Sequence, residues 1–155
     1  MNVEECLDKG LLVKVKPDLE KALSSIKMGG RKLALAEKEF GHKIYESALI
    51  SAYTSMFHSA RAFLFKDGFK ERSHYAIWVY LNEKCRDKIE KRHIGELNAL
   101  RLQRHDLMYN LEDVEEVKEE SASAAIKAAR EFLEAVKKIV ENRVGENANN
   151  KSESA

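Results

Sequence analysis

The chain has very few residues that interrupt helices. Its 155 residues include only one proline and seven glycines. So few helix breakers, in a sequence rich in Ala, Glu, Lys and Leu, predict an all-α protein without a sheet. Long apolar runs are also missing, because no stretch reaches the roughly 18 apolar residues that a membrane span needs. The sequence therefore predicts no contact with the membrane interior.

The chain also has few cysteines and almost no net charge. Cys6 and Cys85 are the only cysteines, and they have neither CxxC nor zinc-ligand spacing. We interpret them as reduced thiols of a cytoplasmic protein, in preference to a disulfide. The N-terminal segment MNVEECLDKG lacks the apolar core of a signal peptide. A net charge of +1 implies no nucleic-acid, membrane or acidic partner by itself, so only a local patch could bind one.

Length and composition indicate one domain followed by a polar tail. We expect a single helical domain over residues 1–144. Residues 145–155, GENANNKSESA, carry almost no apolar side chains and no aromatic ones, so we expect this tail to be disordered.

Apolar periodicity predicts an up-and-down antiparallel bundle of about five helices. The segment from Ile44 to about Lys66 has two adjoining apolar lines, so we expect it to be packed on several sides. We expect Gly68 to cap its C-terminus and Ser73 to cap the next helix. The other expected helices are Val3 to Asp8, a helix from Pro17–Asp18 to Phe40-Gly41-His42, His74 to about Asp87, Ile94 to about Tyr109, and a last helix from Asn110 or Asp113 to near Arg143.

Gly29 and Gly30 lie inside the helix that begins near Pro17. Two glycines cost about 2 kcal/mol relative to alanine in a helix, so they need a reason. Either the helix kinks there, or Gly30 lets the central helix come close. A phosphate-binding loop is disfavoured because no strand precedes the glycines and no GK[ST] follows them.

The segment RLQRHDLMYN carries the first candidate site. Arg101, Arg104, His105 and Met108 share one helical face. Two guanidinium groups suit phosphate oxygens, and an imidazole can move protons near neutral pH. The alternative is a solvated face, with Arg104 paired to Asp106 or Glu112, and both interpretations stay open.

Other histidines have simpler interpretations. His74 follows Ser73, and we interpret Ser73 as a helix cap rather than a nucleophile. We interpret His58, near Arg61, as a hydrogen-bonded core residue. The five histidines are dispersed and match no metal motif, so we predict neither a metal nor a cofactor. A metal oxidase of the bundle type would lack its ligands.

Several segments together resemble the HEPN family (higher-eukaryote and prokaryote nucleotide-binding domain), in its branch of small stand-alone archaeal and bacterial members. The matching text is VKPDLEKA, AYTSMFHSARAFLFKDGFKERSHYA, LRLQRHDLMYN and the closing Ala-rich helix, covering nearly all of residues 12–140. The resemblance implies a helical bundle that forms homodimers. Many members are ribonucleases, often toxins paired with a small nucleotidyltransferase antitoxin, and others bind nucleotides or regulate.

The resemblance also implies a site, from which this sequence departs. The ribonuclease motif is an arginine followed, after four to six residues, by a histidine. Here Arg101 and His105 have three residues between them, and Arg104 has the right gap to Tyr109, which is not a histidine. Tyrosine titrates near pH 10 and is a poor base at neutral pH. In an active enzyme Arg101 and Arg104 would hold phosphate, His105 would act as acid or base, and Tyr109 would orient substrate.

Two functional hypotheses follow. The first is a nucleotide- or RNA-binding member of a toxin–antitoxin-like pair with a minimal nucleotidyltransferase; whether it is a weak or degenerate metal-independent endoribonuclease stays open. The alternative is a non-catalytic dimeric interaction or adaptor protein. In both we expect a homodimer, because the chain has more aromatic side chains than one bundle should bury. These are Phe57, Phe63, Phe65, Phe69, Tyr75 and Trp78.

Overall fold

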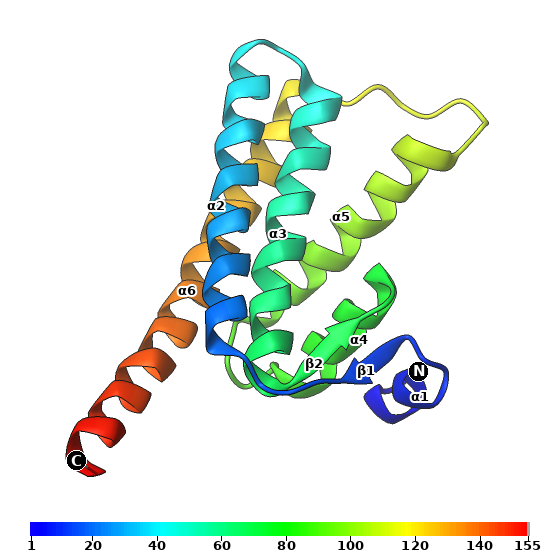
Figure 1. Ribbon diagram of the computed structural model, residues 1–155. Coiled ribbons are helices and arrows are strands. Elements are labelled where there is room, and N and C mark those ends of the chain that lie inside the picture. The colour runs from blue at the N-terminus through cyan, green and yellow to red at the C-terminus, as the bar shows by residue number, and fades with distance from the viewer. Residues whose placement is uncertain (155) are drawn as a thin grey trace.

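The protein is an all-α bundle with one small sheet (Figure 1). The computed structural model describes residues 1–154, and the side chains of residues 1–150. It is 76% helical, which confirms the predicted fold class. The elements are α1 (Val3–Asp8), β1 (Leu12–Lys14), α2 (Leu19–Gly41), α3 (Tyr45–Asp67), β2 (Phe69–Glu71), α4 (His74–Lys84), α5 (Lys91–Tyr109) and α6 (Glu119–Ser154).

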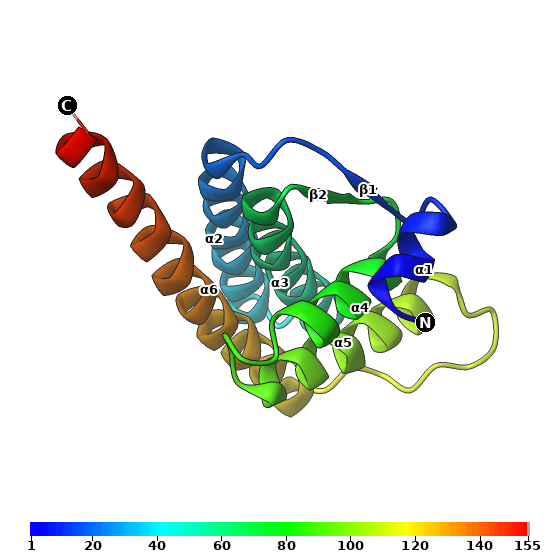
Figure 2. The same cartoon turned by 90° about the horizontal axis from the view of Figure 1, so that it is seen from below.

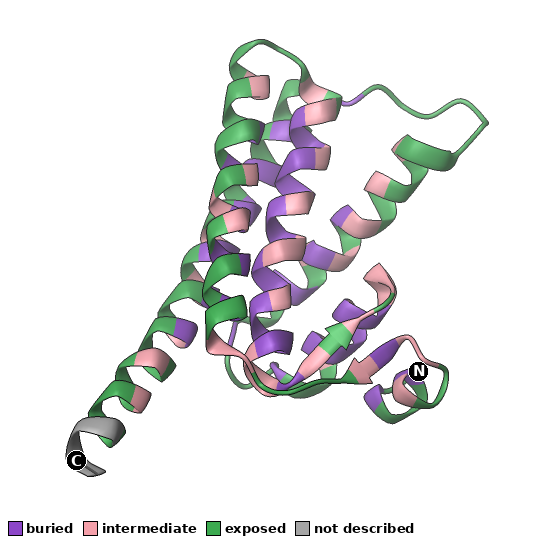
Figure 3. Ribbon diagram, in the orientation of Figure 1, coloured by how far each residue is buried: buried purple, intermediate pink, exposed green. Residues whose placement is uncertain are grey.

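Helix α3 is the centre of the molecule. It lies between α2 and α6 on one side and α4 and α5 on the other (Figure 2). Thirteen of its 23 residues are buried, and they form a band much wider than one stripe, while the side that carries Phe57 and Arg61 is half-buried (Figure 3). This confirms the prediction that neighbours pack on several sides. The largest buried side chains of α3 include Tyr53, Met56, Phe63 and Leu64.

Capping residues set several helix ends where the sequence places them. The Asp18 side chain accepts a hydrogen bond from the Lys21 amide at 3.0 Å and caps α2. Ser73 caps α4 in the same way, accepting from the Ala76 amide at 3.0 Å. Gly68 ends α3 with a φ of +88°, a conformation that glycine adopts without strain. Strand β2 follows this turn, and the Ser73 cap then starts α4 with His74, whose Nδ1 lies 2.7 Å from the Tyr53 hydroxyl of α3.

The prediction that there is no sheet is wrong in one detail. β1 and β2 form an antiparallel pair of three residues each, with Leu12 opposite Glu71 and Lys14 opposite Phe69. Leu12 is buried, so its strand runs close to the core, where unpaired backbone groups would be costly. The short sheet pairs these groups.

The last helix starts later than predicted. Asn110 is the C-cap of α5, and α6 begins only at Glu119. The connection between them is mostly exposed, although Val117 is buried. Val114, which falls within the predicted last helix, lies in this connection and is 39% exposed. The buried face of α6 instead follows Ala122, Ala125, Ala129, Phe132 and Val136.

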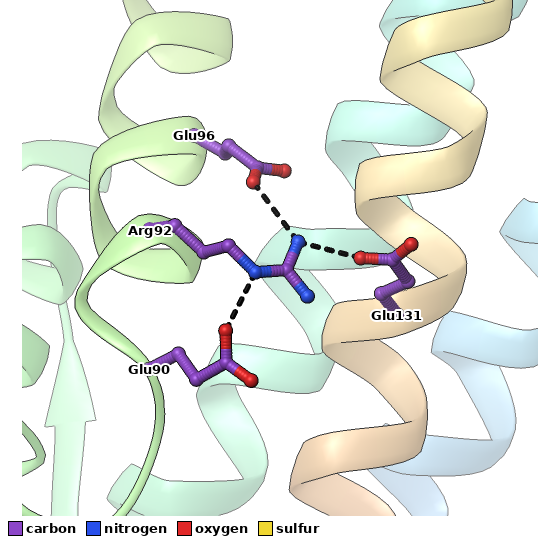
Figure 4. Close-up of polar contacts among 4 residues, drawn as sticks. All are labelled: Glu90, Arg92, Glu96 and Glu131. Atoms are coloured by element: carbon purple, nitrogen blue, oxygen red, sulfur yellow. Dashed lines mark hydrogen bonds and ion pairs between the residues drawn. The ribbon is translucent and has the colours of Figure 1, made fainter.

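A charged cluster joins the start of α5 to the middle of α6 (Figure 4). The Arg92 guanidinium contacts the carboxylates of Glu90 at 2.6 Å, Glu96 at 3.4 Å and Glu131 at 2.5 Å. All four side chains are substantially exposed, so the cluster orients the two helices more than it stabilises them.

Helix α6 continues well beyond its packed part. The sequence predicts an end near Arg143, but the helix runs to Ser154 and projects away from the bundle (Figures 1 and 2). The last fully buried side chain is Val140. Residue 155 and the side chains of 151–155 lie outside the described residues, and the domain boundary at residue 144 stays a prediction.

Deleting residues 145–155 should change the free energy of unfolding by no more than about 0.5 kcal/mol, because residues 145–150 are mostly exposed and the deleted segment carries almost no apolar side chains. Urea unfolding measures the change. A chain that ends at Lys138 is the control, because it also loses Val140, which is fully buried, and should be clearly less stable. A large loss in the shorter deletion would show that the tail docks on the bundle.

None of the helices in the described part of the chain is both long and apolar enough to cross a lipid bilayer.

Candidate functional site

One side of α3 provides the floor of the site. Tyr53, Phe57 and Arg61 follow one another at intervals of four residues and therefore lie on the same face. Tyr53 is only 2% exposed, whereas Phe57 and Arg61 are half-buried. The Arg61 guanidinium lies 5.6 Å from the centre of the Phe57 ring and pairs with Glu71 at 2.7 Å. Its charge is therefore largely neutralised by β2.

His74 lies on this floor, because the Ser73 cap makes it the first residue of α4. Its ring stacks on Phe57, with centroids 4.3 Å apart and planes 24° from parallel. Its Nδ1 atom is 2.7 Å from the Tyr53 hydroxyl, a hydrogen-bonding distance. Two side chains of α3 thus fix the position of one imidazole.

Helix α5 adds two arginines, one above Tyr53 of this floor and one above Tyr75 of α4. The Arg104 guanidinium lies 5.6 Å from the centre of the Tyr53 ring, and that of Arg101 lies 5.4 Å from the Tyr75 ring. Arg101 also donates from Nε and Nη2 to the Asn98 side-chain oxygen, at 3.1 and 2.9 Å. Cation–π contacts of this kind orient a guanidinium without removing its charge.

Neither arginine is neutralised by a carboxylate. Within the described part of the chain, no ion pair includes Arg101 or Arg104. The pairing of Arg104 with Asp106 or Glu112, which the sequence leaves open, is not formed. The site therefore has two positive charges available to an anion.

The titratable groups below these arginines are neutral near pH 7. Burial lowers the pKa of His74 to about 4, assisted by the positive charges of Arg104 and Arg101. Burial also lowers the pKa of His58 to about 4, with Arg61 as the next cause. Burial raises the pKa of Tyr53 to about 12, although the arginines oppose this shift. The site is a neutral aromatic floor beneath two cations.

The other two predicted site residues lie elsewhere on α5. His105 and Tyr109 are both exposed, and their rings contact each other with centroids 5.1 Å apart. They point outward from the bundle, whereas Arg101 and Arg104 are half-buried against α3 and α4. Met108, which shares a predicted face with the arginines, is 47% exposed. The structure therefore divides the predicted four-residue site into two pairs.

A sequence model of the HEPN domain matches residues 22–139. The chain belongs to the HEPN family. The match extends from the first turn of α2 to α6 and contains every residue of the site described above. None of the curated proteins compared with the chain matches it. This membership makes the protein a helical domain of a nucleotide- and RNA-related family.

Sequence reasoning missed part of this HEPN site. It interpreted Ser73 as a cap, correctly, but it gave His74 no role beside the arginines, and it treated Tyr53 only as a core residue. His58 is half-buried against Phe57 rather than enclosed in the core. The available signal was the block AYTSMFHSAR followed by RSHY, where aromatic residues and histidines alternate on two consecutive helices.

The low pKa values of the two histidines make the HEPN fold sensitive to acid. A histidine whose folded pKa lies near 4, below its unfolded value of about 6.5, stabilises the fold above pH 6.5. That contribution is lost as the pH falls from about 6.5 towards 4. Discounted for partial exposure, the expected loss between pH 7 and pH 5 is about 1 kcal/mol per histidine.

Urea unfolding at these two pH values tests this expectation. His74→Gln and His58→Gln should each remove part of the pH dependence, and the double variant most of it. An unchanged pH dependence in the double variant would show that neither histidine is held neutral.

Proposed function

We propose that this HEPN domain binds RNA through the face formed by Tyr53, His74, Arg101 and Arg104. The observation that carries the proposal is the pair of arginines, which have no carboxylate partner and are fixed above tyrosine rings. Guanidinium groups bind phosphate oxygens with two parallel hydrogen bonds. Tyr53 is covered, but the neighbouring rings of Phe57 and Tyr75 are half-buried, which suits the stacking of unpaired bases. The near-zero total charge is no obstacle, because two arginines without a carboxylate partner are close together on this face.

Binding is favoured over cleavage in this proposal. His105, the candidate acid or base, is an exposed side chain whose ring contacts Tyr109, so it is not fixed against the aromatic floor as Arg101 and Arg104 are. His74 is beside the pair, but a pKa of about 4 makes it a weak base near pH 7. Any metal-independent ribonuclease activity should therefore be slow.

The proposal includes a homodimer, although the sequence argument for it does not hold. The six aromatic residues thought to be in excess are all buried or half-buried within one chain. Support comes instead from apolar side chains exposed at the end of α5 and in the following connection: Leu102 at 50%, Met108 at 47%, Tyr109 at 57% and Leu111 at 101%. Light scattering at micromolar concentration should give twice the 17.7 kDa chain mass. A monomeric mass would contradict this part.

The proposal also includes a minimal nucleotidyltransferase as partner in a toxin–antitoxin-like system, which rests on the family. It further includes a cytoplasmic location, which rests on the two free thiols. Co-expression with such a partner should give a complex that survives gel filtration. Separate elution of the two proteins would contradict the proposed partner but would not affect the proposed RNA-binding site.

Fluorescence anisotropy with a labelled single-stranded RNA tests the site. Arg104→Ala should weaken binding about ten-fold or more, because a hydrogen bond to a charged group contributes about 1.5–3 kcal/mol. Arg130→Ala is the matched control, since Arg130 is an exposed arginine of α6 that pairs with Glu37 away from this face. Equal binding by wild type and Arg104→Ala would overturn the proposed site.

Incubating the same RNA with protein and a chelator measures cleavage. The proposal expects little product from wild type. Strong cleavage that His105→Ala abolishes would restore His105 as the catalytic residue. No RNA binding by a dimeric wild type would favour the non-catalytic adaptor.

A further inference from the structure

A second feature of the same side of the molecule is a groove between α4 and α5. Its volume is about 200 Å³. The main lining residues are Trp78, Asn82, Arg86, Lys91, Gly95 and Asn98. Trp78, Asn82 and Asn98 are half-buried, whereas Arg86 and Lys91 are exposed at the rim.

The groove combines the three kinds of group that hold an unpaired nucleotide. The Trp78 indole offers a stacking surface, and base–aromatic stacking is tolerant of base identity. The Asn82 and Asn98 amides can donate to and accept from a base edge. The cations of Arg86 and Lys91 form no ion pair within the described part of the chain, and the groove lining contains no carboxylate.

A chain of contacts connects this groove to the arginine pair. The rings of Trp78 and Tyr75 have centroids 5.7 Å apart. Tyr75 in turn lies under the Arg101 guanidinium, at 5.4 Å. Arg101 donates to Asn98, which lines the groove. The groove is therefore linked through Tyr75 and Asn98 to Arg101, which is three residues before Arg104 on α5.

We propose that the Trp78 groove is a further subsite for single-stranded RNA, holding one base stacked on Trp78 next to a phosphate bound by Arg101. The inference rests on the proposed RNA binding and extends it. Neighbouring cations and rings suit a strand whose bases are unpaired, because a duplex keeps its bases stacked on one another. A mononucleotide would occupy one subsite only, so affinity should rise with the length of the strand.

Trp78 provides its own probe, because it is the only tryptophan of the chain. Titration with an adenylate octanucleotide should quench its fluorescence, and the quenching should saturate together with the anisotropy signal. AMP should bind at least ten-fold more weakly, and a duplex of the same length should quench little. Trp78→Ala should lose about ten-fold in octanucleotide affinity, the scale of one base–aromatic contact, whereas Trp78→Phe should retain most of it.

The rim cations are tested by charge-matched variants. Arg86→Ala/Lys91→Ala should reduce the salt slope of octanucleotide binding by about 1.4, since each phosphate contact to a single strand contributes about 0.7. Lys137→Ala/Lys138→Ala removes two exposed positive charges of α6 and should leave the slope unchanged. Circular dichroism confirms that each variant is folded.

The outcomes separate this inference from the proposed function. Tight binding by wild type with no quenching, and with Trp78→Ala and Trp78→Phe equal to wild type, would overturn the groove while leaving the arginine face intact. Absence of any octanucleotide binding by wild type would overturn both.

Discussion

Replacing Gly29 with alanine should lower the free energy of unfolding by about 2 kcal/mol. A Cβ atom at this position would lie 2.8 Å from the Ser59 hydroxyl and 3.2 Å from the Ser55 carbonyl oxygen. The first distance is too short for any real contact, and the second is to backbone, which cannot rotate away. α2 and α3 would have to separate at their closest approach.

Separation would also strain two buried hydrogen bonds. The Ser55 hydroxyl donates to the Gly29 carbonyl at 2.7 Å, and the Ser59 hydroxyl donates to the Ser55 carbonyl at 2.8 Å. Overpacking costs about 1–3 kcal/mol, and weakening a buried hydrogen bond adds to that cost. The alanine gains only about 1 kcal/mol in helix propensity, so the net effect is destabilising.

The neighbouring glycine is the matched control. A Cβ atom at Gly30 would meet nothing within 4 Å, so Gly30→Ala should stabilise the protein by up to about 1 kcal/mol. Urea unfolding of both variants measures the contrast. If both substitutions changed the free energy of unfolding in the same direction, α2 and α3 would not pack at Gly29 as described.

Removing both arginines of the candidate site should weaken RNA binding about 100-fold, because each makes a charged contact with phosphate. Arg101→Ala/Arg104→Ala should also reduce the salt slope of binding by about 1.4. Arg31→Ala/Arg130→Ala removes the same charge from exposed positions of α2 and α6 and should leave both quantities nearly unchanged.

The double variant has a second readout that does not depend on RNA. Arg104 and Arg101 both contribute to the low pKa of His74, after burial. Their removal should therefore raise that pKa, which NMR titration of the imidazole measures. An unaltered titration together with unaltered RNA binding would place the arginines away from the site.

Much of the fold could be predicted because local chemistry determines it. The caps at Asp18, Gly68 and Ser73 satisfy backbone groups of their own helices, so a few residues contain the necessary information. The family match adds the fold class independently. The side of a helix that packs against its neighbour was harder to predict. The close contact with α3 occurs at Gly29 rather than Gly30, because which of the two faces α3 depends on how the helices pack. Asn110 ends α5 rather than starting α6.

The candidate site was predicted only in part, because it is a tertiary feature. Arg101 and Arg104 could be found from their spacing on one helix. Tyr53 and His74 are 21 residues apart and meet only when α4 folds back on α3. His105 shares α5 with the arginines but is exposed and contacts Tyr109 instead, and the spacing of a single motif does not reveal which side chains a neighbouring helix covers.

The most direct measurement of the central hypothesis is an NMR titration of the Arg101 and Arg104 Nε–H signals with an unlabelled single-stranded RNA. The account predicts that both signals shift and saturate together, with smaller shifts at the ring of Tyr53. Saturable RNA binding that moves neither guanidinium, while shifting signals on another face, would contradict it.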